Sequence, residues 1–245
     1  MARSFAATDI INCGSAAILD DLAPGPLGGC CWIYPITGNT LGRAYIKMNA
    51  AHTVGWSLTT HNDNNIMYTE ARATTARARI SAANTLKLNC WNFIAFAIAS
   101  SLNYVDIHIY HAIGVAPLIE VAYLTEINGV GAYATDAAEP LYIGNRAAAD
   151  QPFQGYLADM RLWKRIPTIP EFEVARQELS TGLPFDAVGS WPLWGYGAEP
   201  DFSGNGSLGI VTGTTRVAHP NAIADTDAYS KHSLLAEIAR GWCRN

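Results

Sequence analysis

Short segments in which apolar and polar residues alternate follow one another along most of the chain. Glycine, asparagine, aspartate, serine or proline stands in nearly every gap between them, and these residues favour turns. Strands with such short connections are typical of an antiparallel sandwich or barrel, and no β–α–β rhythm indicates a parallel sheet. We expect strands over 29–36, 44–48, 54–60, 66–71, 77–81, 91–100, 104–111, 118–124, 140–145 and 153–163.

Two segments repeat their apolar residues at the helical period instead. In the first, Phe172, Ala175 and Leu179 recur at helical intervals, and Thr168 with Glu171 has the spacing of a capping box. This pattern predicts a short helix at about 169–179. The second segment, 233–241, ends at a glycine and predicts another short helix.

The second helix follows a linker-like stretch, so we divide the chain into a sandwich domain and a C-terminal arm. The domain comprises residues 1–216, and the linker with its helical arm comprises residues 217–245. We expect the large apolar residues of the arm to form an assembly interface: Leu234, Leu235, Ile238 and Trp242. Their partner is either the sandwich of the same chain or another subunit, and the sequence leaves both open.

Composition narrows the class of protein. The chain has 245 residues, of which 49% are hydrophobic and 15% charged, and this balance excludes a disordered chain. Lys and Arg total 16 against 21 Asp and Glu, so the chain lacks the basic footprint of a nucleic-acid-binding protein. The longest apolar run, around 93–99, is too short to span a membrane. No apolar leader follows Met1, so we expect synthesis in the cytoplasm without an export signal.

The chain has five cysteines, so at least one is free or pairs with another chain. Cys30 and Cys31 are neighbours in an expected strand and point to opposite faces, so they cannot easily bond to each other. We expect buried, unpaired thiols in a reducing compartment.

Several segments together resemble a known superfamily. Residues 153–163 read FQGYLADMRLW and follow LYIGN at 141–145, while 4–12 and 84–98 have the character of a first strand and of a Trp-Asn strand. These motifs resemble the laminin G-like branch of the concanavalin A-like lectin/glucanase superfamily. The resemblance covers roughly 1–215 and implies an all-β, two-sheet antiparallel jelly-roll sandwich. Because this superfamily has many unrelated activities, the resemblance is far more specific for fold than for function.

Residues 190–194 and 201–206 resemble a further element of the same superfamily, of the form D-x-S-G-N-G. In many relatives this element precedes the sandwich, whereas here it follows. Residues that tolerate a left-handed backbone make it a tight connection. The oxygens of Asp201 and Asn205 are also candidate calcium ligands, so the segment is interpreted either as a turn or as a metal site.

Catalysis receives little support from the sequence. Laminarinase-type relatives use an E-x-D-x-E strand that places two carboxylates on one face, and this chain has no such string. Glu120, Glu126 and Glu139 are each isolated. We therefore expect a protein that is not an enzyme.

The expected strand 104–111 contains a candidate ligand row. Alternation directs Val105, Ile107 and Ile109 into the core, and directs Asp106, His108 and Tyr110 together to the opposite face. Relatives with a concave sheet hold ligands on such a face. The alternative interpretation is that this face is simply exposed to solvent. His111 lies on the opposite face from His108, so the two cannot share one metal ion.

Aromatic residues in a glycine-rich loop form a second candidate. Trp194 and Tyr196 stand in the sequence WGYG, where they either stack on a sugar ring or bury against the tail. We expect the other tryptophans in strand contexts to belong to the core: Trp32, Trp91, Trp163 and Trp191.

Two functions from different classes remain. Laminin G-like chains of this kind resemble decoration or tail proteins of bacterial viruses, which implies a non-catalytic display protein on a virion surface. Its partners would be further copies or other structural subunits. The alternative is a carbohydrate-binding lectin module that recognises glycans with or without calcium. The two functions are compatible if a display protein also adheres to glycans.

Overall fold

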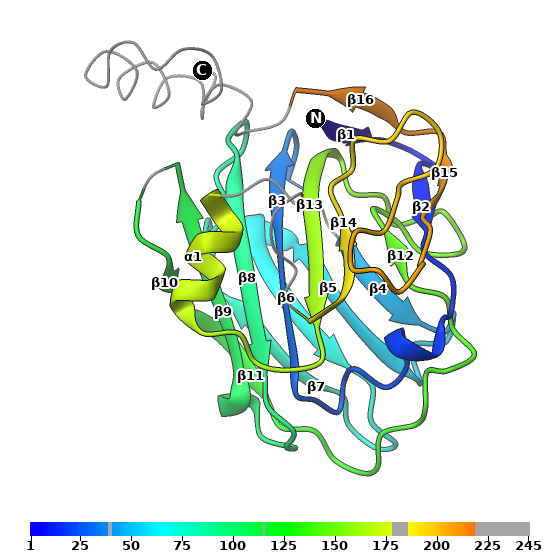
Figure 1. The fold of residues 1–245 in the computed structure, drawn as a ribbon. Helices are drawn as coiled ribbons and strands as arrows, with labels where there is room; N and C mark the ends of the chain where they lie inside the picture. The colour runs from blue at the N-terminus through cyan, green and yellow to red at the C-terminus, as the bar shows by residue number, and fades with distance from the viewer. Residues whose placement is uncertain (39–40, 115, 178–185, 219–245) are drawn as a thin grey trace.

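The computed structural model describes residues 1–38, 41–114, 116–177 and 186–218. Two antiparallel sheets pack face to face, and the described residues contain one α-helix, so the expected two-sheet sandwich is confirmed. In Figure 1, α1 (Ile169–Gln177) covers one side of the first sheet, and the strands of the second sheet lie behind it.

The first sheet has the strand order β10-β9-β8-β3-β13-β1-β16, and β14 also pairs with β13. Its strands are β10 (Ile119–Glu120), β9 (Ile107–Ile113), β8 (Asn92–Ile98), β3 (Leu27–Pro35), β13 (Gly155–Trp163), β1 (Ala2–Phe5), β16 (Thr215–Val217) and β14 (Ala187–Trp191). Because β16 closes the sheet beside β1, residues far apart in sequence meet at this edge.

The second sheet has the order β11-β7-β6-β5-β4-β12-β2-β15. Its strands are β11 (Tyr123–Ile127), β7 (Arg77–Ser81), β6 (Asn65–Glu70), β5 (Gly55–His61), β4 (Leu41–Met48), β12 (Tyr142–Ile143), β2 (Ile10–Asn12) and β15 (Ile210–Thr212). Three 3₁₀ turns complete the elements: η1 (Ala17–Leu19), η2 (Asn62–Asn64) and η3 (Tyr104–Asp106).

Strand alternation explains how the sheets fill the core. In β3, Cys31 and Ile33 face the space between the sheets, while Cys30 and Trp32 face outward, and all four are fully buried. Trp32, Trp91 and Trp163 join the outer apolar layer, and Trp191 lies between the sheets, which confirms that these four tryptophans belong to the core. The central strands of the first sheet therefore bury apolar residues on both faces.

The helix α1 supplies part of the cover on that outer face. Phe172 is fully buried and packs edge-on against Trp163, with ring centroids 6.2 Å apart. The predicted capping box is confirmed, because the Thr168 N–H donates to Glu171 at 2.7 Å and the Glu171 N–H donates to the Thr168 hydroxyl at 3.4 Å.

The cysteines differ from the sequence expectation at one position. Cys13, Cys30 and Cys31 are free and buried, and burial raises the pKa of each thiol. Cys90, in contrast, is disulfide-bonded, so the expectation of unpaired thiols is wrong for this residue.

The predicted second helix lies outside the described residues, as do the expected interface residues Leu234, Leu235, Ile238 and Trp242. The sandwich itself extends to β16, whose Val217 pairs with Ala2. Within the ranges that the structure describes, no helix has the length and apolar character needed to cross a lipid bilayer.

Candidate functional site

The predicted ligand row on 104–111 forms only in part. The strand β9 begins at Ile107, and the three residues before it form η3. Val105 is 50% exposed rather than in the core, and the Asp106 carboxylate accepts a hydrogen bond from the Ser101 hydroxyl at 2.5 Å. The expectation that Asp106 continues the strand alternation is therefore wrong, because Asp106 belongs to the 3₁₀ turn η3 and not to the strand.

The other two members of the row do lie together. The rings of His108 and Tyr110 are stacked, with centroids 6.3 Å apart and an interplanar angle of 18°. The Nδ1 atom of His108 is 3.0 Å from a carboxylate oxygen of Glu120, and Tyr110 packs against Phe172 of α1. Both side chains thus already have protein partners.

His111 has a different environment from His108. Its Nε2 lies 2.9 Å from the side-chain oxygen of Asn92, and burial lowers its pKa to about 4. Asn92 accepts this hydrogen bond and fixes the neutral Nε2–H tautomer.

The loop aromatics Trp194 and Tyr196 do not form one platform. Trp194 is half-buried and packs edge-on against Phe202, with ring centroids 5.7 Å apart. Tyr196 is 93% exposed, and the Arg216 guanidinium lies 3.9 Å from its ring centroid. Tyr196 is therefore an accessible aromatic surface that is held in place by a cation–π contact.

Asp201 and Asn205 close a turn. One oxygen of Asp201 accepts the N–H groups of Ser190 and Ser203 at 3.0 and 2.9 Å, and the other accepts the Ser207 N–H at 3.0 Å. The Asn205 amide donates to the carbonyl of Ala187 at 3.2 Å. These contacts account for both residues as turn-forming groups, and no cluster of three or more His, Cys, Asp or Glu suited to a metal ion occurs within the described ranges.

A polar pocket that sequence reasoning missed lies at the start of β4. Its volume is about 330 Å³. Two segments of the chain line it: one lies before and within the start of β4, and the other lies just before β13. The lining residues are Gly38, Leu41, Gly42, Asp150, Gln151, Pro152 and Gln154. A volume of this size falls in the range of roughly 300–1,000 Å³ that small-molecule sites occupy.

Arg43 contacts the pocket through the lining residue Gln151. It is 3% exposed, and its Nε donates to the Gln151 side-chain oxygen at 2.8 Å. Its Nη1 donates to the hydroxyls of Ser57 and Thr59 at 3.1 and 2.7 Å. Burial, and secondarily the positive charge of Arg146, lowers the pKa of Arg43 to about 10.

The rim carries one carboxylate and a second amide. Arg146 holds Asp150 by two hydrogen bonds, and these lower the pKa of that carboxyl. The side-chain oxygen of Gln154 accepts the Thr37 hydroxyl at 2.7 Å. The pocket therefore offers fixed amide groups and a single anchored carboxylate, rather than the paired carboxylates that glycoside hydrolysis requires.

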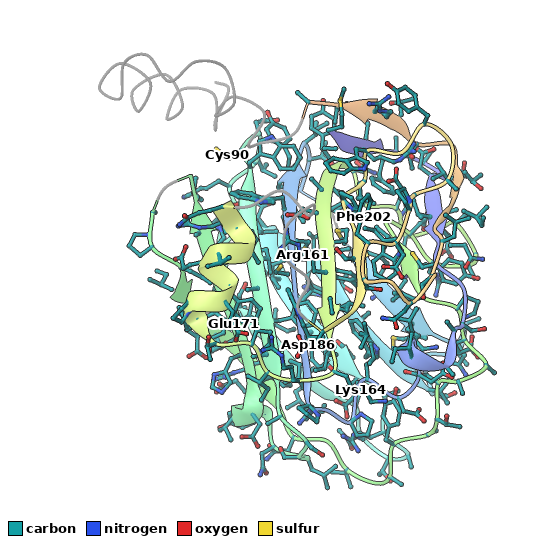
Figure 2. The ribbon with its side chains drawn as sticks, viewed as in Figure 1. Cys90, Arg161, Lys164, Glu171, Asp186 and Phe202 are labelled. Atoms are coloured by element: carbon teal, nitrogen blue, oxygen red, sulfur yellow. The ribbon has the colours of Figure 1, made fainter. Side chains whose placement is uncertain are left out.

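A second cavity, of about 270 Å³, lies beside α1 and is mostly apolar. In Figure 2, Arg161, Glu171 and Asp186 lie on the side of the first sheet that α1 covers. Arg161 pairs with Asp159 at 2.9 Å, and Arg165 pairs with Glu171 and Asp186, each at 2.7 Å. These charges are already compensated, so the cavity offers a ligand fewer open polar groups than the β4 pocket.

Comparison with known proteins bears on the fold. No family model and no curated protein matches the chain. A Bacteroides ovatus protein with a proposed carbohydrate-binding role has a TM-score of 0.56 at 14% identity, covering 87% of this chain and 58% of its own. Domains LG4-5 of the mouse laminin α1 chain give 0.40 at 14% identity, covering 66% and 40%. Tailspike protein 2 from Escherichia coli O157:H7 bacteriophage CAB120 gives 0.44 at 12% identity, covering 78% and 26%.

This chain thus shares the two-sheet antiparallel sandwich fold with the Bacteroides ovatus protein. It spans 58% of the length of the Bacteroides ovatus protein, and at identities this low the similarity says nothing about which ligand the chain binds.

Proposed function

We propose that this chain is a non-catalytic carbohydrate-binding module whose ligand occupies the β4 pocket. The observation that carries the proposal is the fixed set of polar groups around a cavity of about 330 Å³. Amide groups of Gln151 and Gln154 supply donors, and the Asp150 carboxylate supplies an acceptor. Sugar hydroxyls both donate and accept, so they match a site of mixed donors and acceptors.

The buried Arg43 also holds the Gln151 amide of the pocket in a fixed orientation. Two groups of the buried Arg43 guanidinium hold one oxygen of Gln151, so the amide is oriented before a ligand arrives. Such preorganisation avoids part of the entropy cost of binding.

The test is a glycan array followed by titration of any retained glycan. We expect Gln154→Ala to weaken binding about 2- to 12-fold, the loss of a hydrogen bond of about 0.5–1.5 kcal/mol. The matched control is Gln177→Ala, the same change on the exposed end of α1, which should leave affinity unchanged. If the array retains no glycan, the proposal is refuted. If Gln154→Ala binds with full affinity, the assignment of the ligand to the β4 pocket is refuted. A parallel array in EDTA reports whether binding needs calcium.

A second function, display as a subunit of a larger assembly such as a virion surface, is favoured by one apolar patch. Here the edge patch denotes six exposed apolar residues near β10 and β11, the edge strands of the two sheets. They are 39–66% exposed and comprise Leu102, Val105, Ile119, Leu124, Ile127 and Val130. Hydrogen bonds from Gly129 to Leu102 and from Tyr104 to Asn128 bring η3 beside the end of β11. Exposed edges with apolar side chains favour association.

Light scattering tests this second function. We expect the purified chain to exceed the 26.4 kDa of a monomer, and Leu124→Asp to reduce the mass. The control is Leu208→Asp, because Leu208 is also half-exposed but lies outside the edge patch. A monomer at all concentrations argues against self-assembly through this patch.

A further inference from the structure

Arg43 differs from the other buried arginines in its lack of a counter-ion. No carboxylate lies within ion-pair distance of it in the part of the chain that the structure describes. The other buried arginines each pair with a carboxylate: Arg3 with Glu199, Arg77 with Glu70, Arg161 with Asp159, and Arg176 with Glu173. Burial of an ion without its opposite charge is costly, so this exception needs an explanation.

The amide groups of the pocket favour a ligand that accepts hydrogen bonds. Arg43 has only donors, so the Gln151 oxygen must face it, and the Gln151 NH₂ group has no acceptor among the described residues. The Gln154 oxygen accepts from Thr37, and this leaves the Gln154 NH₂ group as a second donor. Both residues line the cavity, so they bring two amide donors to it.

The charged groups around the pocket have a net positive charge. Arg43 and Arg146 contribute two positive charges, and Asp150 contributes one negative charge that Arg146 already holds. His52, whose Nε2 is 2.9 Å from Arg146 Nη1, has its pKa lowered by burial and by both arginines, which favours the neutral ring, so it adds no positive charge. The pocket therefore has a net positive charge of one.

We propose that the pocket selects sugars that carry a carboxylate. The carboxylate accepts from the NH₂ groups of Gln151 and Gln154 and compensates the charge of Arg43, while sugar hydroxyls donate to Asp150. A planar acceptor with two oxygens matches two amide donors. This inference rests on the proposed carbohydrate binding and specifies its substrate class.

The experiment compares a glucuronate-containing oligosaccharide with its carboxyl-reduced derivative, so that the two ligands differ only in the acidic group. Wild-type protein should bind the acidic form at least tenfold more tightly, and 0.5 M NaCl should remove most of that preference. Gln154→Glu places a carboxylate on the exposed rim and should weaken the acidic ligand at least tenfold but the reduced ligand less than threefold. Gln177→Glu, the same change on α1, should alter neither.

The outcomes separate this inference from the proposed function. Equal or tighter binding of the reduced ligand overturns the acidic preference and leaves carbohydrate binding intact. Binding of a sulfated analogue without binding of the glucuronate ligand overturns the choice of a carboxylate. If neither matched ligand binds while other glycans do, the substrate class is wrong, and if no glycan binds, both proposals fail.

Discussion

The Lys47 ammonium is buried at the centre of an oxygen cage, and its removal gives a quantitative test of the structure. Its Nζ lies 3.1 Å from a carboxylate oxygen of Asp20 and 3.5 Å from one of Asp136. It also donates to the backbone carbonyls of Asp136 and Glu139 at 2.9 and 2.5 Å. The side chains of Lys47 and Asp136 are both 0% exposed. Lys47→Met keeps much of the side-chain volume but leaves these oxygens without their cation.

The expected cost follows from the burial. Removal of one partner of a buried ion pair destabilises a protein by roughly 3–5 kcal/mol. For a domain of this size each kcal/mol shifts Tm by about 2–4 °C, so we expect a Tm lower by roughly 6–20 °C. Burial raises the pKa of Asp136, and Lys47 opposes that rise. Without Lys47 the pKa rises further, so the destabilisation is largest at neutral pH and shrinks as the pH falls and Asp136 becomes protonated.

Urea unfolding of the wild type and of Lys47→Met at pH 7.5 and pH 5 measures both effects. The control is Lys87→Met, because Lys87 is exposed and its loss should change stability by no more than about 0.5 kcal/mol. A loss below about 1 kcal/mol, or one that is the same at both pH values, would show that Lys47 does not compensate buried Asp136.

Two further predictions concern backbone strain and acid stability. Gly144 and Gly204 have φ of +82° and +85°, but a Cβ at Gly144 would meet the Phe5 ring at 2.1 Å, whereas one at Gly204 would meet nothing within 4 Å. Gly144→Ala should therefore lower Tm far more than Gly204→Ala, whose strain is roughly 1–2 kcal/mol, and equal melting shifts would contradict this packing. Because the His111 pKa falls to about 4 in the fold, its stabilisation is present above pH 6.5 and is lost as the pH drops towards 4. His111→Gln should flatten that decline in denaturant titrations, and an NMR pKa near 6.5 would rule out the burial.

Much of the fold could be predicted because its signals are local. Alternation in 29–36 and 153–163 marks strands that form as β3 and β13, and the spacing of Thr168 and Glu171 marks the start of α1. The same rule failed at 104–106, where alternation continues but the chain forms η3. Hydrogen bonds to residues beyond the segment decide that turn, and no local pattern contains them.

The β4 pocket could not be found from sequence because its parts are distant. Arg43 and Gln151 are 108 positions apart, and their contact depends on how the segment before β13 crosses the start of β4. A register shift between Arg43 and Tyr45 also disturbs the alternation at this point, so the side of the sheet that Arg43 faces is not readable from the pattern. The signal that the sequence does offer for the pocket is a charged residue, Arg43, near the start of an apolar strand.

The two proposed functions use separate parts of the second sheet. In the order β11-β7-β6-β5-β4, four strand spacings separate the edge patch at β11 from the strand that lines the pocket. At about 4.8 Å per spacing the two strands are about 19 Å apart, so a subunit bound along β11 leaves the pocket of β4 accessible. Leu124→Asp should then change the assembled mass but not glycan affinity, and Gln154→Glu should do the reverse. If instead one variant altered both measurements, the pocket and the edge patch would have to belong to a single interface, and display and recognition could not be independent properties of this sandwich.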